Sequence, residues 1–381
     1  MNNSVLTARL EKLNRDNLDF YLTQNALLIS QEQSSLWLHK STFFIKSWFE
    51  AFEERMSSDN ESPWVFLLEE RDADCVAPLA IIFLVRKNGK FPVRWGSAGK
   101  IFGSPGPLIL PGRENEFLRR FFYALKQESR FYFLDLAPTN EPWIENVKKL
   151  AFAQPKSRVR LEISVFFDAP YIELFDFQNL KSRKLAEQLA RTKRNFARDM
   201  VSFEHRTIWN EEITEYLETL YLLHESAWPK SIFNVYRGVY RDFLQLLCQG
   251  NAEFEARLDI LLLEGSEAAL VFGIVIRDRY YYLIPTYSSR YANFSPGSLL
   301  ILEVIADLKI RGIKVFDFMN SLEPYKLKWT DSILERYKYV FFSHMFFSPN
   351  LVFFWPRFLA KFGIIREKLK RLLSFQNHVS H

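Results

Sequence analysis

The chain has 381 residues, of which 48% are hydrophobic and 25% are charged. This length is too great for one comfortable core, so we expect two domains and a short appendage, and the composition excludes a mainly disordered protein. The net charge of +5 is mild, and because basic residues are mostly interleaved with acidic ones, the composition does not require nucleic-acid binding.

Cysteine usage and hydropathy indicate the compartment. Cys75 and Cys248 are far apart and lack metal-ligand spacing, which argues against a disulfide framework and against a zinc site. The opening segment MNNSVLTARL has no apolar core of the signal-peptide type, and no apolar run reaches the roughly 18 residues that cross a bilayer. We therefore expect a cytoplasmic protein without a membrane span and without a metal.

The first half of the chain is predicted to form a helix, an antiparallel meander, a loop, a second helix and a strand. The meander turns at Asn88-Gly89, a dipeptide typical of tight hairpins. In chain order, these elements are the helix 41–56, the meander 63–97, the loop SPGPLIL at 104–110, the helix 114–129 and the strand 131–136.

The second half repeats this order of elements. It contains the meander 256–289, the loop SPGSLLI at 295–301, the helix 299–312 with Gly312 as its C-cap, and the strand 314–320. Asp135 and Asp317 fall in comparable aromatic strands. We infer a duplication and an α/β (α+β) fold, in which each copy is a mixed, mainly antiparallel sheet flanked by helices.

Two helices are predicted between the copies, and a third at the chain end. The helix 181–198 is strongly basic, the helix 211–228 has one apolar face, and the tail 346–381 reads as a basic amphipathic helix that packs on the domains or lies on an anionic membrane. The predicted domains are therefore 1–168 and 169–345, followed by this tail.

The second Ser-Pro-Gly loop fits a phosphate site. A strand, a short loop with glycine and a helix start together present free amides and the positive end of the helix dipole. Ser295 is the expected N-cap, with the helix beginning near Pro296. The phosphate ligands expected from this pattern are the amides of Gly297, Ser298 and Leu299 and the side chain of Arg290.

The first Ser-Pro-Gly loop lacks the same donors. Pro107 and Pro111 each remove an amide, and the helix cannot begin until about Arg113. We expect the loop at 104–110 to be structural and the loop at 295–301 to bind the cofactor.

Several segments together resemble a known family. They run in family order over most of residues 40–345 and read STFFIKSWFEAF, SRKLAEQLARTKRNF, LHESAW, YYYLIPTYSSRYANFSPGSLLILEVI and KVFDFMNSLEPYKLKWT. In this combination the chain resembles the GNAT-fold acetyltransferases related to the CelD proteins of cellulose biosynthesis, and more distantly the Fem peptidoglycan aminoacyltransferases. The double-glycine signature of the general GNAT loop is absent.

The resemblance implies tandem GNAT-like domains, of which the second binds acetyl-CoA or another acyl-CoA. The family's pyrophosphate loop corresponds to Asn293 through Leu299. A backbone amide near Pro285 to Tyr287, where two strands splay, would polarise the thioester carbonyl. Tyr325 is the candidate acid for the leaving sulfur or else an aromatic packing residue.

Further site residues follow from the same resemblance, each with an alternative. Lys326 binds a phosphate or is a solvated lysine, and Trp329 is assigned to the substrate. Asp317 is a base or a structural anchor. His224 and Glu225 form a base facing the acceptor or are ordinary helix-end residues. Arg191 and Arg194, on the basic helix, line an anionic acceptor or belong to a solvated face.

The function implied by the resemblance is N- or O-acetylation of a saccharide or cell-envelope polysaccharide precursor by a cytoplasmic enzyme. One alternative is tRNA-dependent aminoacyl transfer of the Fem type, in which the basic helix would face a tRNA. Another is a non-catalytic scaffold of the same fold, held on an anionic membrane by the tail helix.

Overall fold

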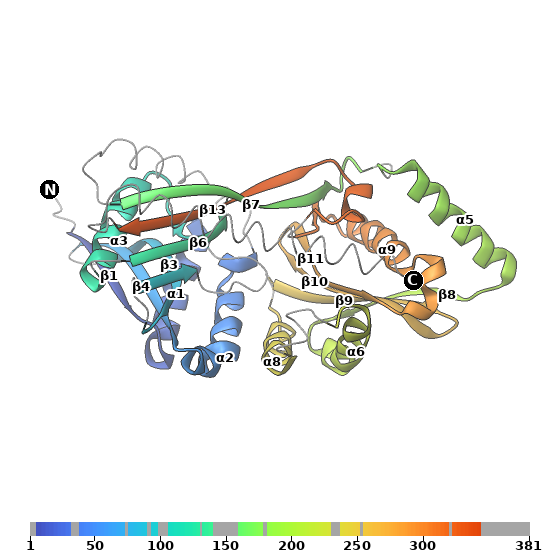
Figure 1. Cartoon of the computed structure of the whole chain (residues 1–381), viewed down its shortest axis with the longest axis horizontal. Coiled ribbons are helices and arrows are strands. Elements are labelled where there is room, and N and C mark those ends of the chain that lie inside the picture. Colours follow the sequence, from blue (N-terminus) through green and yellow to red (C-terminus); the bar gives the residue numbers. More distant parts are fainter. Residues whose placement is uncertain are drawn as a thin grey trace.

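The computed structural model describes residues 5–31, 38–72, 75–89, 93–97, 106–129, 132–139, 159–177, 181–229, 237–251, 254–319 and 322–343. Within these ranges, 13 strands belong to one sheet, and helices cover both of its faces (Figure 1). The predicted tail helix at 346–381 lies outside the described residues.

The N-terminal half of the sheet is built from β1 to β6. Strands β2 and β3 are buried along most of their length, as expected of near-continuous apolar runs. The elements of this half are β1 (Val5–Lys12), α1 (Arg15–Gln31), η1 (Leu38–Lys40), α2 (Thr42–Ser58), β2 (Glu61–Arg71), β3 (Val76–Lys87), β4 (Val93–Ser97), β5 (Leu108–Ile109), α3 (Glu114–Glu128) and β6 (Tyr132–Thr139).

The C-terminal half follows, and two long strands join it to the first. The joining strands are β7 (Val159–Glu173) and β13 (Ile333–Ser343). Between them in the chain lie α5 (Arg183–Asp199), β8 (Phe203–Trp209), η2 (Asn210–Tyr216), α6 (Leu217–Ala227), α8 (Arg237–Leu247), β9 (Phe254–Leu263), β10 (Ser266–Ile276), β11 (Arg279–Tyr287), η3 (Ser289–Phe294), α9 (Pro296–Ile310), β12 (Val315–Asp317) and η4 (Lys326–Lys328).

The predicted repeat is present in the strand order. The sheet runs β1-β2-β3-β4-β6-β13-β7-β12-β11-β10-β9-β8. From one outer edge inward the first five strands are β1, β2, β3, β4 and β6, and from the other edge they are β8, β9, β10, β11 and β12, so both halves have the same strand order. Among the described strands, only β4 with β6 and β11 with β12 pair in parallel, and a helix connects the strands of each such pair. Asp135 and Asp317 are the last residues paired in these two ladders. The aspartates therefore do occupy comparable positions.

Strands β7 and β13 exchange between the halves. β13 follows β12 in the chain, yet it pairs with β6 and β7. β7 pairs with β13 over 159–170 and with β12 over 171–173, and Figure 1 shows both strands crossing from one half to the other. The predicted division between residues 168 and 169 falls inside β7, and the two-domain assignment stays a prediction.

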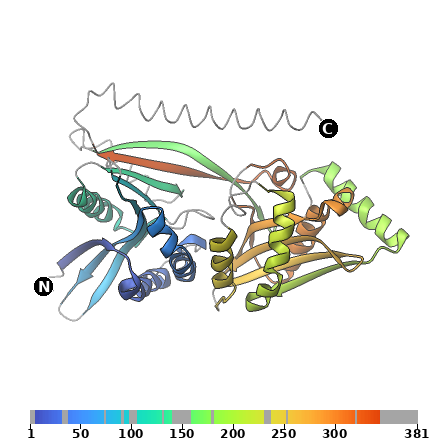
Figure 2. The same cartoon turned by 60° about the horizontal axis from the view of Figure 1, so that its bottom comes forward.

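Three hydrophobic clusters hold the layers together. One runs through both halves, because α1 and α2 share it with α6, α8 and one face of β9 to β11. A second lies between the other face of the C-terminal sheet and the helices α5 and α9, and a third lies under α3. Figures 1 and 2 show α9 and α5 on the opposite face of this sheet from α6 and α8.

Two predicted elements differ in their limits. The helix predicted over 211–228 begins as the 3₁₀ segment η2 and becomes α-helical only at Leu217. Asn210, the first residue of η2, has φ of 48°, and its Oδ1 accepts a hydrogen bond from the amide of Ala256 (2.9 Å). The strand predicted over 314–320 ends at Asp317, because Met319 has φ of 58° and leaves the strand direction.

Candidate functional site

β12 pairs with β11 along its whole length, but β11 is paired with β12 only over its first three residues. The parallel ladder ends at Tyr281 and Asp317, where β12 stops while β11 continues. From Tyr282 onward, this edge of β11 faces no other strand in the part of the chain that the structure describes. Backbone groups at such an edge remain available to a ligand.

A β-bulge lies just beyond the end of this ladder. Phe272 pairs with Ile284 and Gly273 with Tyr282, so Leu283 has no partner on β10. A bulge bends the strand, increases its local twist and is common beside functional sites. This irregularity lies two residues before Pro285, which begins the segment where the sequence places the splayed amide. Pro285 itself remains paired with Val271.

The start of α9 offers one free amide. Ser295 precedes the helix with φ of 53°, and its carbonyl accepts the amides of Ser298 (3.0 Å) and Leu299 (3.1 Å). The amide of Gly297 has no backbone partner among the described residues, and nothing lies within 4 Å of the position that a Cβ would take there. Of the three predicted phosphate donors, Gly297 is thus the most available. The Leu299 side chain is in the core.

The loop residues before α9 are mostly exposed. Arg290 and Asn293 face solvent, and the Arg290 guanidinium lies 5.2 Å from the ring centroid of Tyr291. The sequence predicts that the side chain of Ser295 caps α9, but it does not. Its Oγ accepts a hydrogen bond from Gln188 Nε2 on α5 instead (2.6 Å). This bond fixes α5 against the loop.

Four of the seven cations at 181–198, on or next to the basic helix α5, are paired with acids. Lys181, Arg183, Lys193 and Arg198 pair with Asp331, Glu187, Glu303 and Asp199, respectively. Lys184, Arg191 and Arg194 are exposed. At 100° per residue, Lys184 and Arg191 lie within about 60° of Gln188, whereas Arg194 lies about 120° away. Arg191 therefore borders the loop side of α5, and Arg194 points away from it.

The turn after β12 holds Tyr325. Its side chain is partly buried, and Lys326 Nζ lies 5.8 Å from the centroid of its ring. Burial, assisted by Tyr282 and Glu323, raises the pKa of Tyr325 well above its ordinary value. Tyr325 therefore stays protonated and able to donate. Because Tyr282 is the first residue of β11 beyond the paired region, Tyr325 stands at the parting of the strands.

The neighbouring charged residues are buried and paired. Lys326 Nζ lies 2.8 Å from Glu323 Oε2, and burial lowers the pKa of its ammonium although Glu323 opposes this. Asp317 contacts Arg279 Nη1 (3.2 Å) and accepts the Met319 amide (2.8 Å). These contacts favour the anchoring role of Asp317 over that of a base.

Trp329 belongs to the core. Its side chain is 2% exposed and packs in the cluster between the sheet, α5 and α9. In this structure the indole supports the Tyr325 turn from inside, and it does not face solvent where the predicted substrate contact would lie.

His224 stands at the other side of the end of β11. Its ring lies 5.3 Å from that of Trp228, which in turn lies 6.1 Å from the ring of Tyr287. His224 is buried, whereas Trp228 and Tyr287 are about 40% exposed, at 41% and 38%. Glu225 is exposed and lies 3.6 Å from a guanidinium nitrogen of Arg237. The two predicted partners thus face different surroundings, and His224 joins an aromatic row at the end of β11.

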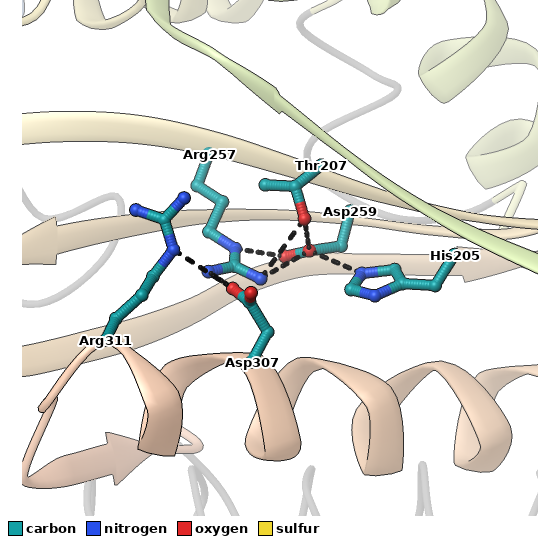
Figure 3. Close-up of polar contacts among 6 residues, drawn as sticks. All are labelled: His205, Thr207, Arg257, Asp259, Asp307 and Arg311. Atoms are coloured by element: carbon teal, nitrogen blue, oxygen red, sulfur yellow. Dashed lines mark hydrogen bonds and ion pairs between the residues drawn. The ribbon is translucent and has the colours of Figure 1, made fainter.

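A buried ionic network ties α9 to the sheet (Figure 3). Arg257 Nε and Nη2 each lie 2.7 Å from an oxygen of Asp259, and Nη1 lies 2.6 Å from Asp307 Oδ2 on α9. His205 Nε2 and Thr207 Oγ1 also contact Asp259, at 2.8 and 2.9 Å. Burial alone would raise the pKa of the Asp259 carboxyl, but hydrogen bonds from His205 and Arg257 outweigh it and lower that pKa.

The corresponding helix start in the N-terminal half differs. Gly106 and Pro107 are buried, and α3 begins at Glu114, within a residue of the predicted start. The Gly112 amide donates to Glu114 Oε1 (3.2 Å), and Glu116 adds a second carboxylate to the first turn. Acidic side chains at this helix start oppose the binding of an anion.

Some residues of the site had no signal in the sequence. Tyr282 stands in a run of three tyrosines, Glu323 in an ordinary loop, and Gln188 on a helix chosen for its cations. Their involvement depends on contacts across β11, the turn after β12 and α5. A pattern of apolar spacing does not report such contacts.

Part of the chain is similar to a known family of domains. A family model described as an acetyltransferase (GNAT) domain matches residues 183–327, which span α5 through η4. This match contains the loop before α9, the parting of β11 and β12, and Tyr325. A search of curated proteins found no match.

Solved structures with a TM-score above 0.5 share the fold over most of the chain. A conserved protein of unknown function from Bacteroides thetaiotaomicron VPI-5482 is 11% identical, with 88% of this chain and 100% of that chain covered and a TM-score of 0.53. FemX is 9% identical, with 87% and 96% covered and a TM-score of 0.53. A tandem GNAT protein from the clavulanic acid biosynthesis pathway is 11% identical, with 90% and 100% covered and a TM-score of 0.49.

Within the described ranges, no three His, Cys, Asp or Glu side chains are grouped as a metal site would require. None of the described helices has both the length and the apolar character to cross a membrane.

Proposed function

We propose that the C-terminal half is an acyl-CoA-dependent acyltransferase that acetylates a saccharide or cell-envelope polysaccharide precursor. The observation that carries this proposal is the convergence of three features inside the matched region: the parting of β11 and β12, the free Gly297 amide at the start of α9, and the protonated Tyr325. The CelD-like assignment is part of the same proposal.

The start of α9 suits a phosphate of the acyl-CoA. The Gly297 amide and the positive end of the helix dipole attract an anion, and the absence of a side chain lets a phosphate approach. Gln188 and the buried network of Arg257 hold α9 from two sides. The acyl-CoA supplies the activated thioester, and the chain supplies the orientation.

The parting of the strands suits the reacting group. The edge of β11 after Tyr282 has backbone amides able to stabilise negative charge on an acyl oxygen. Tyr325, whose pKa is raised, keeps its proton at neutral pH and can donate it to a leaving thiolate. These are the two requirements of acyl transfer that the described residues meet.

The acceptor is proposed to bind on the side of β11 where Trp228 and Tyr287 are exposed. Aromatic rings with one free face contact the apolar face of a sugar ring while leaving its hydroxyls hydrated. His224, packed against Trp228, borders this surface. A saccharide acceptor is therefore consistent with the side chains at the end of β11.

Binding and turnover test the proposal together. CoA should stabilise the protein against heat, and acetyl-CoA with D-glucosamine as a probe acceptor should release free thiol, measured with a thiol reagent. Stabilisation by bulk tRNA without stabilisation by CoA would instead favour Fem-type aminoacyl transfer. Absence of any CoA binding would overturn the proposed function.

A further inference from the structure

The helix α5 runs along the loop that precedes α9. Gln188 Nε2 donates a hydrogen bond to Ser295 Oγ (2.6 Å), and two turns later the ring centroid of Phe196 lies 5.2 Å from that of Phe294. At 1.5 Å per residue, these two contacts lie about 12 Å apart along the helix axis. One face of α5 is therefore fixed beside the proposed phosphate site over about two turns.

The two flanks of α5 have different surroundings. Lys193, about 140° around the helix from Gln188, pairs with Glu303 on α9. Lys184 and Arg191 lie within about 60° of Gln188 in the opposite direction from Lys193, and both side chains are exposed. One flank thus faces the body of α9, and the flank with Lys184 and Arg191 borders its start and is open to solvent.

This open flank is electropositive. Both acids of α5 pair with other arginines of the same helix, so neither of them neutralises Lys184 or Arg191. The loop 288–298 has one charged residue, Arg290, which is also a cation. The free amide of Gly297 and the start of α9 add partial positive charge at the same place. The ligand expected on this flank is therefore an anion.

Two adjacent cations of this kind suit a phosphate monoester. Such a group carries a charge of about −1.5 to −2 at pH 7, and a guanidinium binds phosphate oxygens through two parallel hydrogen bonds. Besides its pyrophosphate, CoA has a phosphate monoester on the 3′ position of its ribose. Arg191 stands one turn from Gln188, with their Cβ atoms about 5–6 Å apart, and Gln188 touches the loop at Ser295. A phosphate next to a pyrophosphate at Gly297 is within reach of its side chain.

We propose that Lys184 and Arg191 bind the 3′-phosphate of the acyl-CoA and make the site selective for CoA over 3′-dephospho-CoA. This assignment rests on the proposed function. Arg191 then belongs to the cofactor site and not to the acceptor site that the family resemblance implies. No bond forms or breaks at the 3′-phosphate, so the two cations contribute to affinity and not to the chemical step.

The test compares the binding of CoA and 3′-dephospho-CoA by calorimetry at low salt. The wild type should bind CoA about tenfold more tightly, the lower end of the range for a hydrogen bond to a charged group. The double variant Lys184→Ala/Arg191→Ala should bind CoA about tenfold more weakly than the wild type does. Its affinity for 3′-dephospho-CoA should stay within about twofold of the wild-type value, which also shows that the variant is folded.

Arg194→Ala is the matched control. It removes an exposed cation from the same helix, but Arg194 lies about 120° from Gln188 and points away from the loop. This variant should keep the full preference for CoA. Because the contact is exposed, the preference of the wild type should also shrink as salt is added.

The possible outcomes separate this proposal from the proposed function. Equal affinity of the wild type for the two ligands, an unchanged preference in the double variant, or equal weakening of both ligands in that variant would overturn the 3′-phosphate assignment while the proposed function stands. Failure of the wild type to bind either ligand would overturn the proposed function, and the assignment with it.

Discussion

Replacing Gly297 by Trp should strongly weaken CoA binding without harming the fold. No atom lies within 4 Å of the position that a Cβ would take at Gly297, and the residue does not need a positive φ. An indole there enters open space at the first turn of α9. The unliganded stability should therefore change by only about 0.5 kcal/mol, as for other surface substitutions.

The expected loss of affinity follows from the contacts of this site. A charge-assisted hydrogen bond from the Gly297 amide to a phosphate contributes about 1.5–3 kcal/mol, or roughly 10- to 100-fold in Kd. The indole also fills the space through which the phosphate would approach. At a CoA concentration of about 100 times the wild-type Kd, ligand stabilisation is about 2.7 kcal/mol, and a 100-fold weaker variant would keep only about 0.4 kcal/mol.

Gly238→Trp is a matched control for this experiment. Gly238 is the second residue of α8, as Gly297 is of α9, and it too has nothing within 4 Å of a Cβ. Thermal unfolding with and without CoA should show wild-type stabilisation in Gly238→Trp and almost none in Gly297→Trp. Equal stabilisation of the two variants would refute the placement of the phosphate at α9.

Three other predictions concern charge. Asp259→Asn should destabilise the protein by about 3–5 kcal/mol in urea unfolding, because it leaves the fully buried Arg257 without its main partner. The pKa of Asp259 is lowered in the folded state, so its contribution to the free energy of unfolding is present above the unfolded pKa of about 3.9 and is lost as pH falls below that pKa. Between pH 5 and pH 2, the urea midpoint of the wild type should therefore fall more than that of Asp259→Asn. In calorimetry at low salt, Arg191→Glu should weaken CoA binding by about tenfold and Arg194→Glu by less than threefold. Equal effects of the two variants would mean that α5 does not border the cofactor site.

The repeat was predictable because its elements have local sequence signals. Apolar runs, the Asn88-Gly89 turn, and the helix start at Pro296 and helix end at Gly312 each depend on a few neighbouring residues. Gly312 indeed follows α9 with φ of 78°. The same local signals placed the start of α3 correctly, because Pro107 and Pro111 exclude an earlier one.

The exchange of β7 and β13 was not predictable in the same way. Each reads as an ordinary strand, and nothing local tells that β13 crosses back to β6. Likewise, the predicted N-cap bond of Ser295 is absent: the residue has a left-handed backbone with φ of 53°, and its Oγ accepts instead from Gln188, more than a hundred residues earlier in the chain.

The candidate site was partly predictable for a related reason. Tyr325 and Gly297 stand in motifs with a fixed place after a strand or before a helix. Glu323 and Tyr282 stand in no such motif, and their place in the site follows only from their position beside Tyr325 in the fold. The role of Trp329 differs because its position in the turn directs the indole into the core.

A crystal structure with CoA would show whether the C-terminal half alone holds an acyl-CoA. We expect a pyrophosphate at the Gly297 amide, the pantetheine arm along the free edge of β11 after Tyr282, and no ligand at the start of α3. Density for CoA at α3, or none between β11 and β12 in crystals saturated with CoA, would contradict it.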